Sequence, residues 1–283
     1  MAPLHERLAD ARDRFVRAGI AGAEAALDAE VLARHVLGCD RATFLIRARD
    51  PLPSAFDRLF EDLVRRRLAR EPVAYITGHR EFWGLEFEVT PAVLIPRPET
   101  ELIIEESLAV LPARDTVGHI IDVGTGSGCL AIALAIEFSS AKVVATDSSE
   151  AALAIAARNC SRHHVTNRVS LIRTDLLDGL VEPADLIVSN PPYVPDSDAP
   201  RLQPEVVRYE PQSALFAGDD GLDIIRRLFA EGSDRLADRG LLIIEFGIGQ
   251  EPELREAARQ TGWTVERVRR DLQGIPRVAV LRR

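Results

Sequence analysis

Hydrophobic residues recur at helical spacing through the N-terminal part of the chain. Between residues 54 and 70 the apolar positions share one helical face, and most arginines of this stretch lie off that face. The apolar residues are Phe56, Leu59, Phe60, Leu63, Val64 and Leu68. The same spacing predicts helices over 4–15 and 27–36, with glycine and proline turns between them. Residues 1–75 are therefore predicted to form a helical domain, either a bundle that only packs on itself or a module that recognises a partner.

The hydrophobic period changes after this helical part. Apolar and polar residues alternate around Gly84, which predicts two short strands joined by a turn. The apolar members are Phe82, Leu85, Phe87 and Val89. We interpret residues 76–95 as a β-hairpin linker. Pro98 then stands where proline is favoured, in the first turn of a helix predicted to run to Leu111.

Short apolar runs alternate with helical stretches from residue 118 onward. The runs predicted to be strands are 119–123, 142–146, 169–173, 185–189, 241–246, 263–268 and 277–281. The helices predicted between them are 127–138, 150–160, 221–236 and 251–261. This alternation is typical of a doubly wound α/β fold with a mostly parallel, here seven-stranded, sheet, which binds ligands at the carboxyl ends of its strands. Residues 96–283 are assigned to this domain.

Composition places the chain among soluble globular proteins. Of its 283 residues, 46% are hydrophobic and 28% charged, and no apolar run approaches the ~20 residues of a membrane span. The N-terminal residues are charged, unlike a signal peptide, and the cysteines lack the paired spacing of a zinc site. We expect a cytoplasmic protein without membrane contact, and no metal site is visible in the sequence.

Charge is divided unevenly along the chain. Residues 1–80 hold 14 arginines against 12 acidic residues, whereas residues 81–283 hold 21 basic and 32 acidic ones. Proteins that bind nucleic acid usually present a basic face. The acidic C-terminal part therefore disfavours a nucleic-acid partner.

A glycine-rich loop follows the first strand predicted for the α/β domain. Gly124, Gly126 and Gly128 open a helix, whose N-terminal N–H groups favour an anionic part of a ligand. Their spacing is GxGxG, whereas the dinucleotide fingerprint GxGxxG would require glycine at Cys129. Together with Asp122, two residues before the loop, this spacing favours a cofactor other than a dinucleotide.

Acidic residues follow the next two strands. Asp147 ends the second strand, where a carboxylate can accept hydrogen bonds from both hydroxyls of a ribose. The alternative is a helix cap, although Ser149 alone could provide it. Asp175, after the third strand, is either a contact for an adenine amino group or an ordinary turn residue.

The segment Asn190-Pro191-Pro192-Tyr193 is the most specific feature of the sequence. It follows an apolar strand, so Asn190 is expected at the strand's carboxyl end, facing the cofactor. The prolines stiffen the turn and provide no N–H group, so carbonyl oxygens dominate what it presents. The side-chain oxygen of Asn190 and the carbonyl of Pro191 can both accept hydrogen bonds from one planar NH₂ group, on which Tyr193 can stack. An ordinary Asn-Pro turn is the alternative.

These motifs together resemble the class I S-adenosylmethionine-dependent methyltransferases that act on planar NH₂ nitrogens. Adenine, guanine and protein glutamine methylases share the Asn-Pro-Pro-Tyr motif, so it implies the reaction and leaves the substrate open. The resemblance implies Asn190, Pro191 and Tyr193 as catalytic residues. It also implies S-adenosylmethionine as the cofactor, bound by Asp122, Gly124, Thr125, Gly126, Ser127, Gly128, Asp147, Asp175, Leu176 and Asn190.

Further segments narrow the substrate. Residues 71–78, 80–83, 94–100 and 271–278 are similar to those of the peptide chain release factor glutamine methyltransferases. This resemblance implies methylation of the glutamine in the Gly-Gly-Gln motif of class 1 release factors, with the helical domain recognising that protein. The implied substrate-binding residues are Arg97, Glu99, Asn190, Pro191, Pro192 and Tyr193. The chain departs at Leu176, where some members carry a large aromatic residue beside the adenine.

Other functions share some of these features. An RNA or DNA base methyltransferase would use the same motif but would need a basic approach surface. A ribosomal-protein glutamine methyltransferase is similar but differs before the first strand of the α/β domain. A non-catalytic cofactor-binding adaptor would tolerate Asn190→Ala, and an NAD oxidoreductase fits the glycine spacing poorly. Arg97 could form only a surface ion pair, and Glu245 is either a satisfied strand-end acid or a substrate contact. We expect a monomer.

Overall fold

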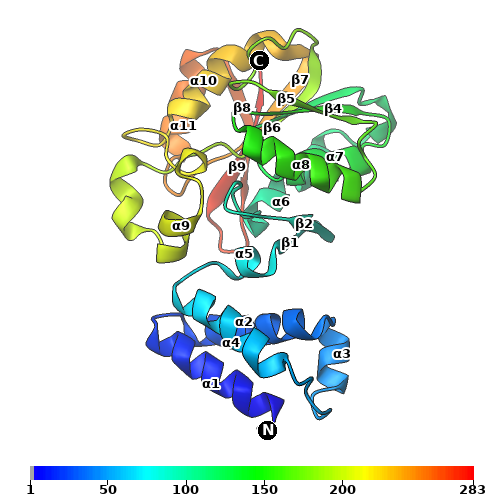
Figure 1. Ribbon diagram of the computed structural model, residues 1–283. Helices are drawn as coiled ribbons and strands as arrows, with labels where there is room; N and C mark the ends of the chain where they lie inside the picture. The colour runs from blue at the N-terminus through cyan, green and yellow to red at the C-terminus, as the bar shows by residue number, and fades with distance from the viewer. Residues whose placement is uncertain (1–2) are drawn as a thin grey trace. The chain divides into compact units, whose positions relative to one another are not determined.

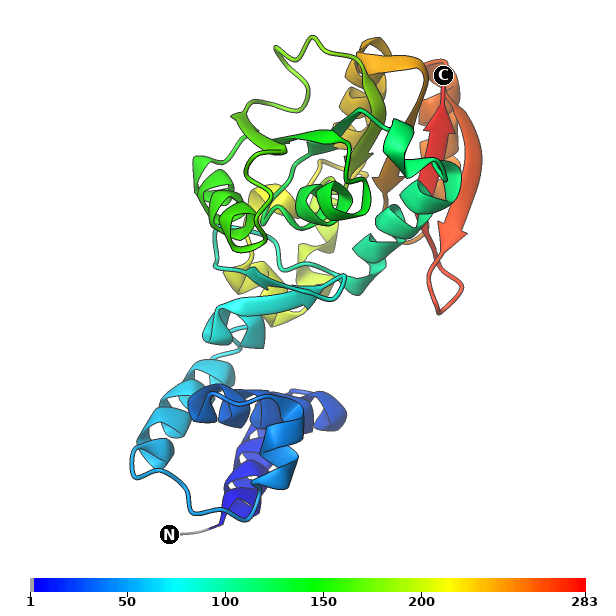
Figure 2. The same cartoon turned by 90° about the vertical axis from the view of Figure 1, so that its right-hand side faces the viewer.

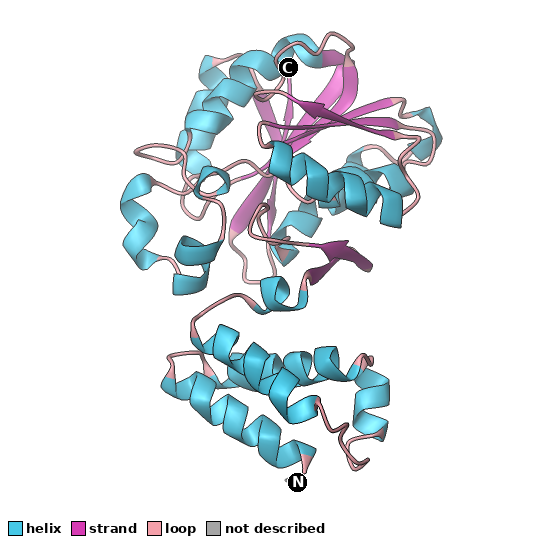
Figure 3. Cartoon of the chain, in the orientation of Figure 1, coloured by secondary structure: helices cyan, strands magenta, loops and turns pink. Residues whose placement is uncertain are grey.

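The computed structural model describes residues 3–283, which divide into two compact units. The helical unit contains the N-terminal residues to Gly78 together with Gln203–Tyr209, and the α/β unit contains His79–Leu202 and Glu210–Arg283. Figure 3 shows helices in the first unit and a sheet with helices in the second. Among the described residues, no helix is both long and apolar enough to cross a membrane.

The amphipathic stripes seen in the sequence build the helical unit. Its helices are α1 (Leu4–Arg17), α2 (Gly22–Leu37), α3 (Arg41–Ile46), α4 (Phe56–Leu68), α5 (Val73–Thr77) and α9 (Pro204–Tyr209). Phe15, Leu32 and Val64 are fully buried where the apolar faces of the first, second and fourth helices meet. Asp40 caps α3, because its carboxylate accepts a hydrogen bond from the Thr43 amide at 2.7 Å.

A buried arginine connects separate parts of this unit. Arg67 on α4 is 2% exposed and donates to Asp28 on α2 and to Glu205 on α9, both at 2.7 Å. A third hydrogen bond runs from Arg67 to Glu24 at 3.0 Å, and Arg70 also donates to Glu205 at 2.7 Å. Burial acts to lower the pKa of Arg67, but these carboxylates hold it above its ordinary value. The cluster secures α9 to the N-terminal helices within the helical unit.

The α/β unit begins with an antiparallel hairpin of β1 (His79–Phe82) and β2 (Leu85–Glu88). Its main sheet has seven strands in the order β5-β4-β3-β6-β7-β9-β8. They are β3 (His119–Val123), β4 (Lys142–Asp147), β5 (Val169–Arg173), β6 (Ala184–Ser189), β7 (Leu236–Glu245), β8 (Thr264–Arg270) and β9 (Pro276–Arg282). Of the seven strands, β9 alone runs in the opposite direction, so it pairs antiparallel with both β7 and β8. Figure 2 shows β8 and β9 at one edge of the sheet in orange and red. The predicted doubly wound, mostly parallel sheet is confirmed.

Helices cover both faces of the main sheet (Figure 1). One face packs against α6 (Glu101–Val110), α7 (Cys129–Glu137) and α8 (Glu150–Arg162), and the other against α10 (Asp223–Gly232) and α11 (Glu251–Gln260). Short 3₁₀ helices add η1 (Pro98–Thr100), η2 (Arg114–Thr116), η3 (Asp196–Arg201), η4 (Gln212–Ala214) and η5 (Ser233–Arg235). The strand order reverses between β3 and β6, so the loops after these strands diverge there and leave room for a ligand.

Candidate active site

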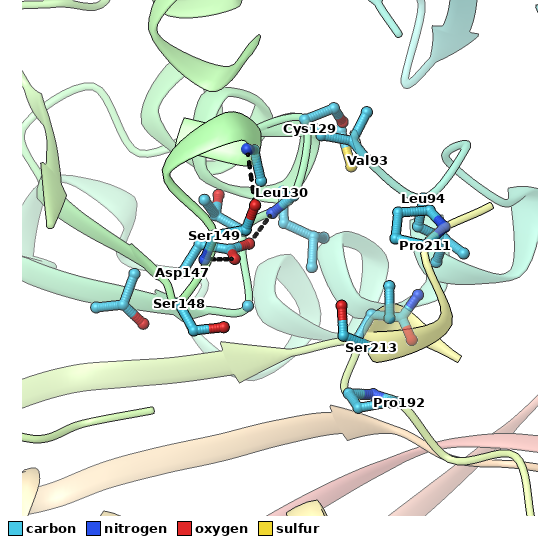
Figure 4. Close-up of a pocket in the computed structure, with 18 of the residues that line it drawn as sticks. Val93, Leu94, Cys129, Leu130, Asp147, Ser148, Ser149, Pro192, Pro211 and Ser213 are labelled. Atoms are coloured by element: carbon cyan, nitrogen blue, oxygen red, sulfur yellow. Dashed lines mark hydrogen bonds between the residues drawn. The ribbon is translucent and has the colours of Figure 1, made fainter. Parts of the chain in front are cut away.

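A cavity of about 200 Å³ lies at the carboxyl ends of the parallel strands in the α/β unit. Four strand-to-helix loops contribute to its wall: Gly124–Ser127 after β3, Asp147–Ser149 after β4, Thr174–Leu176 after β5, and Asn190 with Pro192 after β6. Figure 4 shows Asp147, Ser148 and Ser149 on one side of the cavity and Pro192, Pro211 and Ser213 on another. The motifs identified in the sequence are therefore brought together around one space.

Asp122 supports the glycine loop from behind. It is 1% exposed, and its Oδ2 accepts hydrogen bonds from the Thr125 hydroxyl at 2.6 Å and the Ala131 amide at 3.1 Å. Burial raises the pKa of Asp122 to about 7. Its Oδ1 is also buried and lacks a hydrogen-bond partner among residues 3–283. Asp122 does not line the cavity, so its direct contact with a cofactor stays a prediction.

Gly128 allows the helix after the loop to pack closely. Its φ is +83°, and a Cβ atom there would lie 3.2 Å from the Cβ of Ala156 on α8. Both conditions favour glycine, because other residues rarely adopt this backbone conformation. The loop and the N-terminus of α7 can therefore lie tight against α8, with the loop backbone facing the cavity.

Asp147 links the end of β4 to the glycine loop. Its Oδ2 accepts a hydrogen bond from the Gly126 amide at 2.9 Å, and its Oδ1 accepts one from the Ser149 amide at 2.9 Å. Ser149 itself caps α8 by accepting from the Ala152 amide. The N-terminal cap of α8, which was the alternative role for Asp147, is thus provided by Ser149. Asp147 itself lines the cavity. Its contact with a ribose stays a prediction.

The loop after β5 places Asp175 and Leu176 at the cavity. Asp175 is exposed and accepts a hydrogen bond from Arg227 at 2.9 Å. Leu176 has a φ of +47°, and its carbonyl accepts a hydrogen bond from the Thr146 hydroxyl at 3.0 Å. Such a conformation is uncommon for leucine and tends to occur at functional sites. It holds an apolar side chain where a flat ligand group could be covered.

The Asn-Pro-Pro-Tyr segment leaves β6 at the cavity, as its position in the sequence predicted. Asn190 and Pro192 line the cavity, whereas Pro191 is buried and Tyr193 is half-buried. The Asn190 Nδ2 donates a hydrogen bond to the Thr100 Oγ1 at 2.9 Å. This direction leaves the Asn190 Oδ1 as the acceptor that the side chain can offer a ligand.

Two residues outside the segment hold it in place. Glu245, at the end of β7, is 1% exposed and accepts hydrogen bonds from the Thr100 hydroxyl at 2.7 Å and the Tyr193 hydroxyl at 2.9 Å. Gln250 donates to the backbone carbonyl of Tyr193 at 2.9 Å. Both carboxylate oxygens of Glu245 therefore have hydrogen-bond partners within the protein, as expected for the structural strand-end acid that the sequence left as one of two roles. Sequence reasoning missed Thr100 and Gln250, because no local motif ties them to a segment so far along the chain.

The buried carboxylate also perturbs ionisation within the site. Burial is the main cause that raises the pKa of Glu245 above its ordinary value. The charge of Glu245 in turn raises the pKa of Tyr193 well above its usual range. Tyr193 is consequently held as a neutral phenol, whose hydroxyl donates a hydrogen bond to Glu245.

Arg97 and Glu99 lie on the segment that leads into α6. Arg97 donates to Glu210 at 2.6 Å, and the Glu210 side chain is 1% exposed, so this is an ion pair to a buried acid rather than a surface pair. Glu99 is half-buried. Neither side chain lines the cavity, although Pro96 and Thr100 on either side of them do. Their contact with a substrate stays a prediction.

Family models match both parts of the chain. Residues 6–78 match the PrmC N-terminal domain, and residues 101–209 match the methyltransferase small domain. Among solved structures, the N-terminal domain of human METTL16 in complex with SAH has a similar fold, with a TM-score of 0.52 and 18% identity. That similarity covers 78% of this chain and 83% of the other.

Curated relatives are more similar and extend over nearly the whole chain. The release factor glutamine methyltransferase of Koribacter versatilis is 43% identical over 260 residues, which cover 91% of each chain. That of Nitratidesulfovibrio vulgaris is 38% identical over 286 residues, covering 100% of this chain and 96% of its own. The predicted motifs surround one cavity of the α/β unit, and these relatives are 38% and 43% identical over nearly the whole chain. The chain belongs to the release factor glutamine methyltransferase family.

Proposed function

We propose that this chain transfers the methyl group of S-adenosylmethionine to the side-chain amide nitrogen of a release factor glutamine. The substrate class follows from the names of the relatives, and the Gly-Gly-Gln motif of class 1 release factors is the specific target we propose. The acidic balance of residues 81–283 agrees with a protein substrate better than with a nucleic acid.

The orientation of Asn190 carries this proposal. Its Nδ2 is committed to Thr100, so its Oδ1 is available to accept from an NH₂ group in the cavity. The Pro191 carbonyl follows directly in the chain and is the second acceptor we assign. Two acceptors on one planar NH₂ group would fix the plane of the amide and direct its nitrogen toward the methyl donor.

The residues fit a nucleoside cofactor in the cavity. Asp147 and Asp175 provide carboxylates, Leu176 provides an apolar surface, and the glycine loop allows close backbone approach. S-adenosylmethionine, when bound, supplies an electrophilic methyl group on a sulfonium. In the transfer a carbon–nitrogen bond forms to the amide, the carbon–sulfur bond breaks, and the nitrogen loses one proton to solvent. The protein contributes alignment, which can lower a barrier by up to about 7–11 kcal/mol.

The test is a labelling experiment with the full chain. The protein is incubated with labelled S-adenosylmethionine and a class 1 release factor, and modified peptides are mapped by mass spectrometry. We expect label on the glutamine of the Gly-Gly-Gln motif and, for Asn190→Ala, a kcat lower by about 100- to 1,000-fold. Label on RNA, DNA or a ribosomal protein from a cell extract, with none on the release factor, would overturn the substrate.

We further propose that the helical unit binds the body of the release factor. Two apolar side chains at the end of α3 support this, because Leu45 is 63% exposed and Ile46 is 83% exposed. Ile46→Ser should raise the KM for the release factor with little change in the affinity for S-adenosylmethionine. Val181 in the α/β unit is equally exposed, so Val181→Ser is the matched control. An equal KM for both variants would contradict this role.

A further inference from the structure

A chain of hydrogen bonds lies behind the Asn-Pro-Pro-Tyr segment. It runs from the Asn190 Nδ2 to the Thr100 Oγ1 at 2.9 Å, and from Thr100 to the Glu245 Oε2 at 2.7 Å. A second branch joins the Tyr193 hydroxyl to the Glu245 Oε1 at 2.9 Å. Thr100 is 2% and Glu245 1% exposed, so water does not compete for these bonds. Three separate elements, η1, β7 and the loop after β6, meet at this carboxylate.

The directions of these hydrogen bonds follow from the chemistry of Glu245. An ionised carboxylate has only acceptors, so the hydroxyl protons of Thr100 and Tyr193 must both point to it. The Thr100 oxygen then has only lone pairs left for its other neighbour. It can meet the Nδ2 of Asn190 but not the Oδ1, because two acceptors would face each other. The charge of Glu245 therefore decides which end of the Asn190 amide is turned to the cavity.

We propose that Glu245 is a positioning residue, which acts through Thr100 to keep the Asn190 Oδ1 directed at the substrate amide. The inference rests on the proposed function, because it concerns the same glutamine NH₂ group. Without a negative charge at position 245, the Thr100 proton can turn toward Asn190. The Asn190 amide then flips and presents its NH₂ group to the NH₂ group of the substrate, so that two donors face each other.

The surroundings of Glu245 predict how this arrangement responds to pH. The charged and titratable groups that face it are Tyr193, Glu99 and Arg277, and Arg277 is paired with Asp271 at 3.0 Å. Burial is the main cause that raises the pKa of Glu245, and the negative charge of Glu99 raises it further, whereas the positive charge of Arg277 lowers it. The ionised form is the active one. Methyl transfer is therefore present above this raised pKa and declines as the pH falls through it.

The test compares Glu245→Gln with the wild-type chain on the release factor substrate. Glutamine keeps the size of the side chain but carries no charge and has one acceptor oxygen, so it can no longer accept from both hydroxyls and no longer fixes Thr100 as a donor toward position 245. We expect kcat to fall about 10- to 100-fold, as for the loss of a hydrogen bond to a charged group. The dissociation constant for S-adenosylmethionine should stay within threefold. The decline of kcat at low pH should also disappear in this variant.

Two variants of Thr100 separate positioning from folding. Thr100→Val removes the hydroxyl at nearly constant volume and should lower kcat as much as Glu245→Gln. Thr100→Ser restores the hydroxyl and should return kcat to within about threefold of the wild type. The proposal is overturned if Glu245→Gln keeps the wild-type kcat and its acid decline, or if Thr100→Ser is as inactive as Thr100→Val. A wild-type chain that labels no release factor glutamine refutes the proposed function itself.

Discussion

Replacing Arg67 with methionine should destabilise the helical unit far more than the same change at Arg65, two residues away. Both arginines lie on α4 and both pair with acids. The Arg65 side chain is 66% exposed, whereas the Arg67 side chain is 2% exposed and contacts Asp28, Glu24 and Glu205. Methionine retains most of the apolar stem, so the comparison isolates the charge and its hydrogen bonds.

The magnitude follows from what each variant leaves behind. Without Arg67, the carboxylates of Asp28 and Glu205 stay buried, with side chains 11% and 9% exposed, and Asp28 loses its arginine. Breaking such a pair costs about 3–5 kcal/mol. Glu205 keeps Arg70 at 2.7 Å, so we expect the lower end, about 3 kcal/mol. The exposed Arg65 pair contributes no more than about 0.5 kcal/mol.

The assay uses two probes of unfolding in urea. Both tryptophans, Trp83 and Trp263, lie in the α/β unit, so their fluorescence reports that unit. Circular dichroism at 222 nm includes the helical unit as well. We expect Arg67→Met to move the dichroism transition to lower urea while the fluorescence transition changes less, and hydrogen exchange of Gln203–Tyr209 to accelerate. A free energy of unfolding within about 1 kcal/mol of that of Arg65→Met would refute the reasoning.

Three further predictions concern the α/β unit. Because burial raises the pKa of Asp122 to about 7, the ligand-free chain should lose up to about 3 kcal/mol of stability between pH 5 and 8, and Asp122→Asn should remove this loss in urea titrations. Gly221→Ala places a Cβ 2.2 Å from the Tyr193 carbonyl, so it should lower both stability and kcat. Gly249→Ala also has positive φ but meets no described atom within 4 Å, and should cost only about 1 kcal/mol in thermal unfolding. Asp147→Ala should weaken S-adenosylmethionine binding about tenfold in calorimetry, because it removes the hydrogen bond to the glycine loop.

Much of the α/β unit could be predicted from the sequence, because buried parallel strands leave apolar runs of definite length. The strands at 119–123 and 169–173 have the predicted bounds. The helix predicted over 221–236 was too long, since α10 ends at Gly232 and β7 already begins at Leu236. Leu236 pairs with Ala184 of β6, and this tertiary contact overrides the local helical spacing.

Other parts depend on contacts that local patterns do not encode. Nothing in residues 203–209 signals that Glu205 pairs with Arg67 in the helical unit, because the two residues are far apart in sequence. The boundaries predicted after residues 75 and 95 remain predictions. Within the site, the motif residues were found, but the supporting contacts of Thr100 were not. Motifs identify groups that touch ligands, whereas the residues that orient those groups emerge only from the fold.

The state of the carboxylates at this site argues for catalysis by alignment rather than by a strong base. Among the described residues that line the cavity there is no histidine or lysine. Its two acids are engaged, Asp147 with two backbone amides and Asp175 with Arg227. Glu245 is likewise occupied by two hydroxyls. An amide nitrogen is too weak an acid for any of these groups to deprotonate beforehand, so its proton leaves during or after methyl transfer. In the proposed mechanism, the buried charge of Glu245 contributes to catalysis by orienting Asn190 through Thr100. The Asn190 Oδ1 then faces the cavity and holds the substrate amide in line with the methyl donor.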